Sequence, residues 1–485
     1  MTESILVIDL GTTNIKAVVF DLRGDAVFTC TRPTPFVYDS ESMEIDPDGL
    51  WRTVLSVCGE ALTGGDFSFA AITMSSMAAS FIPINADGRP LHPAIGWADA
   101  RSIPYMREYM DAFLTGSRVE RCAQYPLQMY LPFKAAWFAQ THPDKFRHVE
   151  KWLNVSEYIY AHLTGDRDYR TDYSIASRTI LFDIEAKKWN PAALRWFDID
   201  ENMLPVPVPA GTVIGTAGPE LQAIGFAPGV PIVMGGHDHM CSVPGAGIIG
   251  DDVLLNTTGT SEAVISLYSG AKLDTDKIVD AWLNYEAAMQ SDMTAVIGYV
   301  GMSGRIYQSL GETLQPQATS ADNPPLSAMP VFLPPQRAQL TSVEGELRGL
   351  HPIFDAGLVY RSMCDGLYCE CRRMMERILN ANGSERAKSM RIVGGHTRNT
   401  DEVARKSAAL GIPLEIVDQA NISAVGAAVV AGYGCGKFAS YREAIGALCR
   451  GKVVQIDPDP VLSRRFEDFY HNKYLPCFEN GIHSL

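Results

Sequence analysis

A single aspartate near the middle of the chain carries the strongest chemical signal in the sequence. Asp238 follows the apolar, strand-like run 231–234 and the glycine pair at 235–236, and it precedes a helix-like segment. Glycines at a strand end let a ligand approach the backbone, and a carboxylate held there can accept the proton of a substrate hydroxyl. We therefore expect Asp238 to be a general base, with His237 and His239 within reach of substrate hydroxyls or a carbonyl oxygen.

The same stretch allows a second interpretation, a zinc site. His237, His239 and Cys241 alternate along the chain and would share one face of a strand. A helix that begins near Asp238 would separate these side chains, and for that reason we favour the general base.

Two turns rich in glycine and threonine are suited to phosphate. The first is Gly11-Thr12-Thr13-Asn14, between the β-branched runs 5–8 and 15–20, which predicts a hairpin. The second, 257–260, ends in Gly259 and Thr260 and lies between the strand-like runs 252–256 and 262–267. Backbone N–H groups and hydroxyls in such turns hold phosphate oxygens, and Asp9 can hold Mg²⁺ through water. The alternative for the first turn is an ordinary glycine hairpin whose aspartate bonds its own turn.

The elements that must position these residues indicate an α/β fold. Short apolar runs alternate with amphipathic segments of helical length, with strands expected at 71–74 and 80–84. Helices are expected at 50–62, 104–114, 149–163 and 355–380, and a surface loop at 315–325. Each half begins with strand, phosphate turn and strand, so we expect a duplicated architecture with domains 1–247 and 248–485.

Composition narrows the class of protein. The chain has 485 residues, 46% hydrophobic and 20% charged, as expected of a globular protein with two cores. Its net charge of −15 argues against nucleic acid as a partner. No apolar run approaches the ~18 residues of a membrane span, and no signal peptide is recognisable, so we expect a cytoplasmic protein without membrane contact. The ten cysteines are scattered, which predicts reduced thiols.

Six further segments, in order along the chain, resemble motifs of the FGGY carbohydrate kinases. They are Glu44-Ile-Asp-Pro47 with Trp51, Pro93-Ala-Ile-Gly-Trp-Ala-Asp-Ala-Arg101, Pro132-Phe-Lys-Ala-Ala-Trp137, Thr171-Asp-Tyr-Ser-Ile-Ala-Ser-Arg-Thr-Ile-Leu-Phe-Asp183, Arg391-Ile-Val-Gly-Gly-His-Thr-Arg-Asn-Thr400 and Val425-Gly-Ala-Ala-Val-Val-Ala431. The resemblance implies two actin-like (ribonuclease H-like) α/β domains around a central cleft. A P-loop is excluded, because the glycine-rich stretch 432–438 has the wrong spacing.

The resemblance also implies roles for particular residues. ATP and Mg²⁺ are the expected cofactors, with Asp9 on the metal. The ATP-binding residues would be Gly11, Thr12, Thr13, Asn14, Gly259, Thr260, Gly394, Gly395 and Asn399. His396 stands where the family has a third glycine.

The expected acceptor is a small sugar or polyol. Met77, Ala78, Trp97 and Asp99, together with His237, Asp238 and His239, are the predicted substrate residues. Ala78 and Ala79 stand where xylulose and gluconate kinases typically have Met-His and glycerol kinases have Arg-Glu, so neither specificity carries over. Two short matches, at 236–238 and 398–400, lean toward L-fuculose kinases.

The sequence thus predicts an ATP-dependent kinase acting on a primary hydroxyl. A sugar-sensing protein that has lost turnover is the alternative, and the presence of Asp9 and Asp238 favours the enzyme. A chaperone-like or actin-like ATPase would need a peptide-binding domain, for which the chain has no room, or insertions for polymerisation. The resemblance adds a homodimer as one expected assembly.

Overall fold

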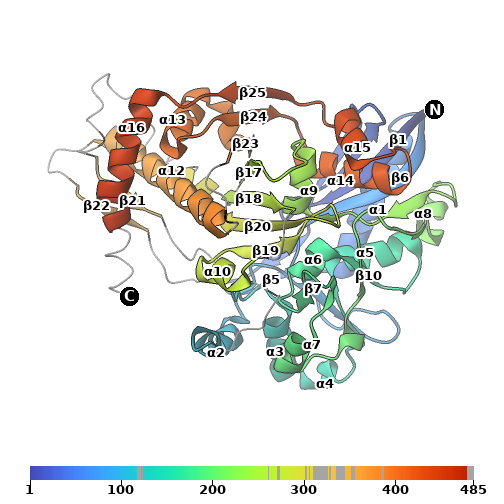
Figure 1. The fold of residues 1–485 in the computed structure, drawn as a ribbon. Helices are drawn as coiled ribbons and strands as arrows, with labels where there is room; N and C mark the ends of the chain where they lie inside the picture. The colour runs from blue at the N-terminus through green and yellow to red at the C-terminus, as the bar shows by residue number, and fades with distance from the viewer. Residues whose placement is uncertain are drawn as a thin grey trace.

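The computed structural model describes most of the chain. The described residues are 1–116, 122, 124–259, 262–269, 273–300, 303–304, 306–307, 309, 326, 329–334, 345–350, 355–381, 383 and 387–477. Two large sheets lie in separate halves of the molecule, one in the blue-to-green first half and one in the yellow-to-red second half (Figure 1).

The two sheets share one strand order. The first runs β14-β15-β6-β1-β2-β3 and the second runs β25-β24-β23-β17-β18-β20, with β19 added beyond β20. In each, three antiparallel strands continue into two parallel strands and end at an antiparallel edge strand. The predicted duplicated α/β architecture is therefore confirmed.

The strands overlap the predicted runs, and most extend beyond them, whereas β15 ends one residue before the predicted run 231–234 does. In the first sheet they are β1 Thr2–Leu10, β2 Asn14–Asp21, β3 Ala26–Pro33, β6 Phe67–Ser76, β14 Val213–Thr216, β15 Pro231–Val233 and β16 Gly236–His237, which pairs with β6. In the second they are β17 Val253–Thr258, β18 Glu262–Tyr268, β19 Asn284–Ala287, β20 Thr294–Tyr299, β23 Ser389–Gly394, β24 Leu414–Asp418 and β25 Lys452–Ile456.

Smaller sheets add to both halves. The order β4-β5-β8-β7-β9 is formed by Phe36–Tyr38, Met43–Ile45, Ala94–Ile95, Phe81–Ile84 and Lys151–Asn154. The two-stranded pairs are β10 Arg170–Asp172 with β13 Val206–Val208, β11 Phe182–Asp183 with β12 Lys188–Trp189, and β21 Val331–Leu333 with β22 Glu346–Arg348.

The described helices surround these sheets. They are α1 Pro47–Thr63, α2 Ile103–Leu114, α3 Leu131–Thr141, α4 Pro143–Phe146, α5 Val155–Thr164, α6 Tyr173–Ser177, α7 Pro191–Phe197, α8 Pro219–Ala223, α9 Asp238–Gly245, α10 Thr275–Asp280, α12 Ala356–Ala381, α13 Thr400–Leu410, α14 Ile422–Gly434, α15 Tyr441–Leu448 and α16 Pro460–Phe469. The predicted helices at 50–62, 104–114 and 355–380 are confirmed. The predicted loop 315–325 lies outside the described residues.

The predicted helix at 149–163 is wrong in its first part. Lys151–Asn154 form β9, which pairs with β7, and α5 begins only at Val155. The Asn154 side chain caps α5, and Glu157 returns a hydrogen bond to the Asn154 N–H in a capping box. This cap sets the helix start after Trp152 and Leu153, which are buried in the small sheet.

A seam of two helices joins the halves. Helix α14 packs against α9 and also against β1 and β6 of the first sheet, and α9 lies beside it in Figure 1. The backbones nearly touch, because a Cβ on Gly426 would lie 1.7 Å from the Cys241 carbonyl oxygen. A Cβ on Gly245 would lie 2.0 Å from the Ile422 carbonyl oxygen. Only glycine fits at either position without moving a helix.

Within the part of the chain that the structure describes, the helices are too short or too polar to traverse a lipid bilayer.

Candidate functional site

Strand register brings the two predicted carboxylates to one edge of the first sheet. Asp9 on β1 is paired with Ser75 on β6, and Ser75 is paired with Gly236 on β16. Asp238 follows two residues later as the first residue of α9. Neighbouring strands lie about 4.8 Å apart, so residues more than 220 positions apart in the chain become neighbours in space.

Asp9 is buried and touches both halves of the protein. Its Oδ1 accepts a hydrogen bond of 3.0 Å from Ser423 on α14, and Lys16 Nζ lies 3.7 Å from its Oδ2. Burial raises the pKa of Asp9, the charge of Lys16 opposes that rise, and the charge of Asp238 adds to it. Lys16 was not among the predicted site residues, because a strand lysine gives no signal of which face it occupies.

The first turn is the predicted hairpin. The Gly11 N–H donates to the Asn14 carbonyl oxygen over 3.0 Å and closes the loop, while Thr13 is exposed. Thr12 has a partner from far along the chain, since the indole Nε1–H of Trp97 donates to its Oγ1 over 3.1 Å. The turn and the predicted acceptor segment are thus in direct contact.

The second turn lies against the predicted adenosine loop. Thr258 of β17 is paired with Gly394 of β23, and its Oγ1 donates to the Val393 carbonyl oxygen over 2.7 Å. Gly394 has a φ of +107°, and a Cβ there would lie 2.4 Å from the Thr258 carbonyl oxygen, so a side chain is excluded. Gly259 and Gly395 are exposed beside it, and the predicted Thr260 lies outside the described residues.

Asn399 and His396 both have structural partners. The Asn399 side chain caps α13 by accepting from the N–H groups of Asp401 and Glu402. His396, in place of a third glycine, packs its ring 4.5 Å from the ring of Tyr307, and burial lowers its pKa.

The predicted acceptor segment is buried and strained. Met77, Ala78 and Ala79 are all less than a tenth exposed, and Ala79 has a φ of +58°, a left-handed conformation that costs a non-glycine residue of order 1 kcal/mol or more. Lys134 Nζ, fully buried, donates to the carbonyl oxygens of Ala79 at 2.6 Å, Ile95 at 3.1 Å and Gly96 at 2.8 Å, and burial lowers the pKa of Lys134 to about 7. Lys134 therefore ties the Ala79 segment to the segment that carries Trp97.

Asp99 is buried beside that segment and has several protein partners. It accepts from the Met43 N–H at 3.0 Å and forms a two-pronged ion pair with Arg101, whose closest contact is 2.7 Å. Arg101 also binds Glu44 at 2.7 Å. This ion pair fixes the Asp99 carboxylate, and its contact with a sugar hydroxyl stays a prediction.

A row of interacting side chains, His237, Glu286 and Arg178, lies behind Asp238 and was not predicted from the sequence. His237 Nε2 lies 3.2 Å from Asp238 Oδ1, and its Nδ1 lies 3.2 Å from Oε2 of Glu286 on β19. Arg178, just after α6, donates to Glu286 Oε1 over 2.7 Å. Arg178 lies in the segment 171–183 that resembles a family motif, whereas Glu286 gives no sequence signal.

The zinc interpretation loses its third ligand. Potential ligand atoms of His237, Asp238 and His239 lie within 4.8 Å of one another, but Cys241 is not part of this group. Its Sγ lies 3.6 Å from Met289 Sδ inside the helix seam. Helix α9 begins at Asp238, as the favoured interpretation required, and carries Cys241 away.

Comparison with family models matches both halves of the chain. Residues 4–245 match the N-terminal domain of the FGGY family of carbohydrate kinases, and residues 254–435 match its C-terminal domain.

Individual relatives are similar to this chain over nearly its whole length. An L-fuculokinase of Escherichia coli O157:H7 is 26% identical over 465 residues, covering 91% of this chain and 94% of its own. A xylulose kinase of Lactococcus lactis is 24% identical over 481 residues, covering 96% and 95%. A ligand-bound xylulose kinase from Lactobacillus acidophilus shares the fold, with a TM-score of 0.88 at 19% identity over 99% of this chain and 98% of that one.

Proposed function

Because the chain belongs to the FGGY family of carbohydrate kinases, we propose that it transfers the γ-phosphoryl group of ATP to a primary hydroxyl of a sugar or polyol. The register of β1, β6 and β16 is the observation that supports this best, because it gathers Asp9, Asp238 and the first phosphate turn at one sheet edge. We place the domain boundary at residues 247 and 248.

Asp238 is the proposed base. Its side chain is 37% exposed, so an acceptor hydroxyl can reach it. Phosphoryl transfer demands mainly positioning and neutralisation of charge, and one carboxylate that takes the hydroxyl proton late in a loose transition state is sufficient. A sensing protein without turnover gains no support, since the relatives named above are kinases.

We propose that the two turns bind the triphosphate. Gly11, Thr12, Thr13 and Asn14 would bind phosphate from one half of the chain, and Gly259 with Thr260 from the other. Gly394, Gly395 and Asn399 would line the adenosine.

Asp9 fits a magnesium ion. Burial and the nearby Asp238 both oppose its negative charge, so a cation beside it is favourable, and carboxylate oxygen is a ligand that Mg²⁺ prefers. When bound, the ion would neutralise charge on the transferring phosphoryl group. The chain's own contribution is to hold the Asp9 carboxylate with Ser423 and Lys16.

The acceptor site is proposed from the segments around Ala79 and Trp97. Met77, Ala78, Trp97, Asp99 and His239 would contact the sugar, and His237 would lie behind Asp238. The small side chain of Ala78 offers no hydrogen bond, so recognition there depends on shape. The acceptor is a small molecule, and a cytoplasmic location and a homodimer remain predictions.

An ATP-consumption screen tests this function. Pentuloses, 6-deoxyhexuloses, tetritols, glycerol and gluconate are offered in turn, and at least one should be phosphorylated with saturable kinetics. Absence of turnover with all five classes would count against the proposal.

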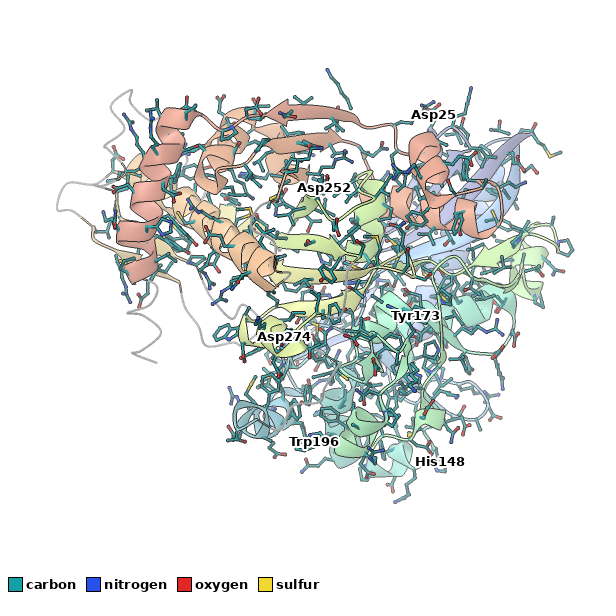
Figure 2. The ribbon with its side chains drawn as sticks, viewed as in Figure 1. Asp25, His148, Tyr173, Trp196, Asp252 and Asp274 are labelled. Carbon is teal, nitrogen blue, oxygen red and sulfur yellow. The ribbon has the colours of Figure 1, made fainter. Side chains whose placement is uncertain are left out.

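Asp238→Asn tests the base. It should lower kcat by about 100- to 10,000-fold while calorimetry still detects acceptor binding. Asp25→Asn is the control, because Asp25 is exposed on the outer end of the first half (Figure 2) and should leave kcat unchanged.

A further inference from the structure

We propose that His237 is a positioning residue for the base Asp238, and that Glu286, supplied by the second half of the chain, fixes the His237 ring. The inference rests on the proposed function, because it takes Asp238 to be the base.

The His237 ring is held from both sides. Its Nε2 is 3.2 Å from Asp238 Oδ1 and its Nδ1 is 3.2 Å from Glu286 Oε2. The side chain is only 6% exposed, and the backbone N–H donates to Ser174 Oγ over 2.9 Å. A ring with both nitrogens engaged and almost no exposed surface has one orientation, so its contact with Asp238 is reproducible.

Glu286 is anchored as a permanent anion. Burial opposes its ionisation, but the charge of Arg178 and the hydrogen bond from His237 outweigh burial and lower the pKa of Glu286 to about 2. The pair is 4% exposed on Arg178 and 0% on Glu286, with a contact of 2.7 Å. Arg178 is held in turn between the rings of Tyr130 and Tyr299, 5.7 and 5.9 Å away. An ionised carboxylate accepts only, so Glu286 requires a proton on Nδ1.

Asp238 is oriented through one oxygen. The His239 N–H donates to Oδ1 over 2.7 Å, and His237 Nε2 lies against the same Oδ1. This leaves Oδ2 for the substrate hydroxyl. With Nδ1 already protonated, an N–H on Nε2 makes the ring an imidazolium, whose charge beside Oδ1 favours the ionised carboxylate, the form a base needs.

Other charges around this ring come from several elements. Asp172 on β10, Arg178 after α6, Tyr299 on β20 and His239 on α9 all face the same cluster. Any pH effect of His237 is therefore read by comparing variants and not from one profile alone.

Two substitutions of His237 separate its two contacts. In His237→Asn the amide reaches the Nδ1 position and keeps the bond to Glu286, whereas in His237→Gln it reaches the Nε2 position and keeps a donor beside Asp238. We expect His237→Asn to lower kcat by about 10- to 100-fold, below the ~100- to 10,000-fold typical of proton transfer itself, with KM for the acceptor changed less than about threefold. The acid limb of kcat/KM should move to higher pH. His237→Gln should recover most of kcat and of the acid limb.

Glu286→Gln tests the anchor by a measurement that needs no substrate. In ¹⁵N-histidine NMR spectra of the intact protein, with the His237 signals assigned from His237→Asn, Nδ1 should carry a proton. In Glu286→Gln the ring should become a mixture of tautomers. Glu370→Gln removes a carboxylate from the similarly buried pair with Arg373 and should leave the His237 signals unchanged.

The outcomes are distinct. Wild-type kcat and an unmoved acid limb in His237→Asn overturn the positioning role, as do equal losses in His237→Asn and His237→Gln. An unchanged His237 spectrum in Glu286→Gln overturns the anchor. If no sugar is phosphorylated, the proposed function fails by itself, while the NMR result still decides the anchor. His148→Asn is the matched surface control, at the outer tip of the first half (Figure 2).

Discussion

The predicted nucleotide side and the predicted acceptor side are built in different ways. The nucleotide side consists of short turns in which several glycines and hydroxyls are exposed, such as Thr13, Gly259 and Gly395. The acceptor side consists of buried polar and charged groups joined across long distances in sequence, such as Asp99 with the Met43 N–H, Lys134 with three carbonyl oxygens, and Arg178 with Glu286.

Phosphate binding and hydroxyl binding are therefore encoded differently in the sequence. A turn that binds phosphate through backbone N–H groups is specified by a few consecutive residues. A pocket that orients hydroxyls needs fixed charges, and a buried charge is tolerated only with a partner that tertiary structure supplies. Substitutions should therefore be milder in the turns than among the buried charges, with Asp9 as the exception.

Among the variants that compare the two sides, Asp9→Asn should lose the most activity. It removes the one carboxylate of the predicted nucleotide side, and loss of a preorganised electrostatic group costs about 100- to 1,000-fold in kcat. Steady-state kinetics over a range of Mg²⁺ concentrations measures this. Thr13→Ala, in the exposed part of the turn, should cost only a few-fold because the backbone N–H remains. Equal losses in the two variants would contradict the backbone-based picture.

Gly426→Ala tests the seam that holds the two regions in register. The new Cβ would meet the Cys241 carbonyl oxygen at 1.7 Å, and such overpacking costs about 1–3 kcal/mol of unfolding free energy. Gly446→Ala is the matched control, because no heavy atom lies within 4 Å of a Cβ at this position on α15, and it should gain up to about 1 kcal/mol. Urea denaturation compares the two variants. An unchanged free energy of unfolding in Gly426→Ala would show that the two helices move apart to accommodate the methyl group.

Glu157→Gln tests the buried charges behind β16. Burial raises the pKa of Glu157 to about 8 and that of Asp172 to about 6. A raised carboxyl pKa in the folded state means that its contribution to stability is complete below the unfolded value of about 4.3 and falls as pH rises through about 8. The loss of Tm between pH 6 and 9 should be smaller in Glu157→Gln than in the wild type, by about 2–4 °C. Parallel Tm curves would indicate that Glu157 does not titrate there.

Trp97→Phe gives the smallest expected effect and acts at the contact between the two sides. It removes the indole N–H that donates to Thr12 and keeps most of the ring. One such hydrogen bond contributes about 0.5–1.5 kcal/mol, or roughly 2- to 10-fold. We expect KM for both ATP and the acceptor to rise within that range, and a change in one alone would show that Trp97 serves only one side.

Local patterns made much of the fold predictable. The hairpin around residues 11–14, the strands on either side of the second turn and the long helix α12 follow from periodicity and turn residues. The start of α5 did not follow, because the run 149–153 is too short to separate a buried strand from a helix and the Asn154 cap decided it.

The residues of the candidate site also divide into those that local sequence predicted and those that it did not. Asp9, Asp238 and the turns were predicted from adjacent residues. Lys16, Lys134, Arg178 and Glu286 were not assigned roles, because their contacts depend on partners far along the chain. The Arg178 to Glu286 pair spans 108 positions, and no periodic pattern can indicate such a contact.

The glycine contact between α9 and α14 has a consequence for protein engineering. The two helices come from different halves of the polypeptide, and each presents bare backbone to the other at Gly245 and Gly426. A chimera that exchanges one lobe with a relative will assemble well only if both helices come from the same parent. Crossover points are therefore best placed before β16 and after α14.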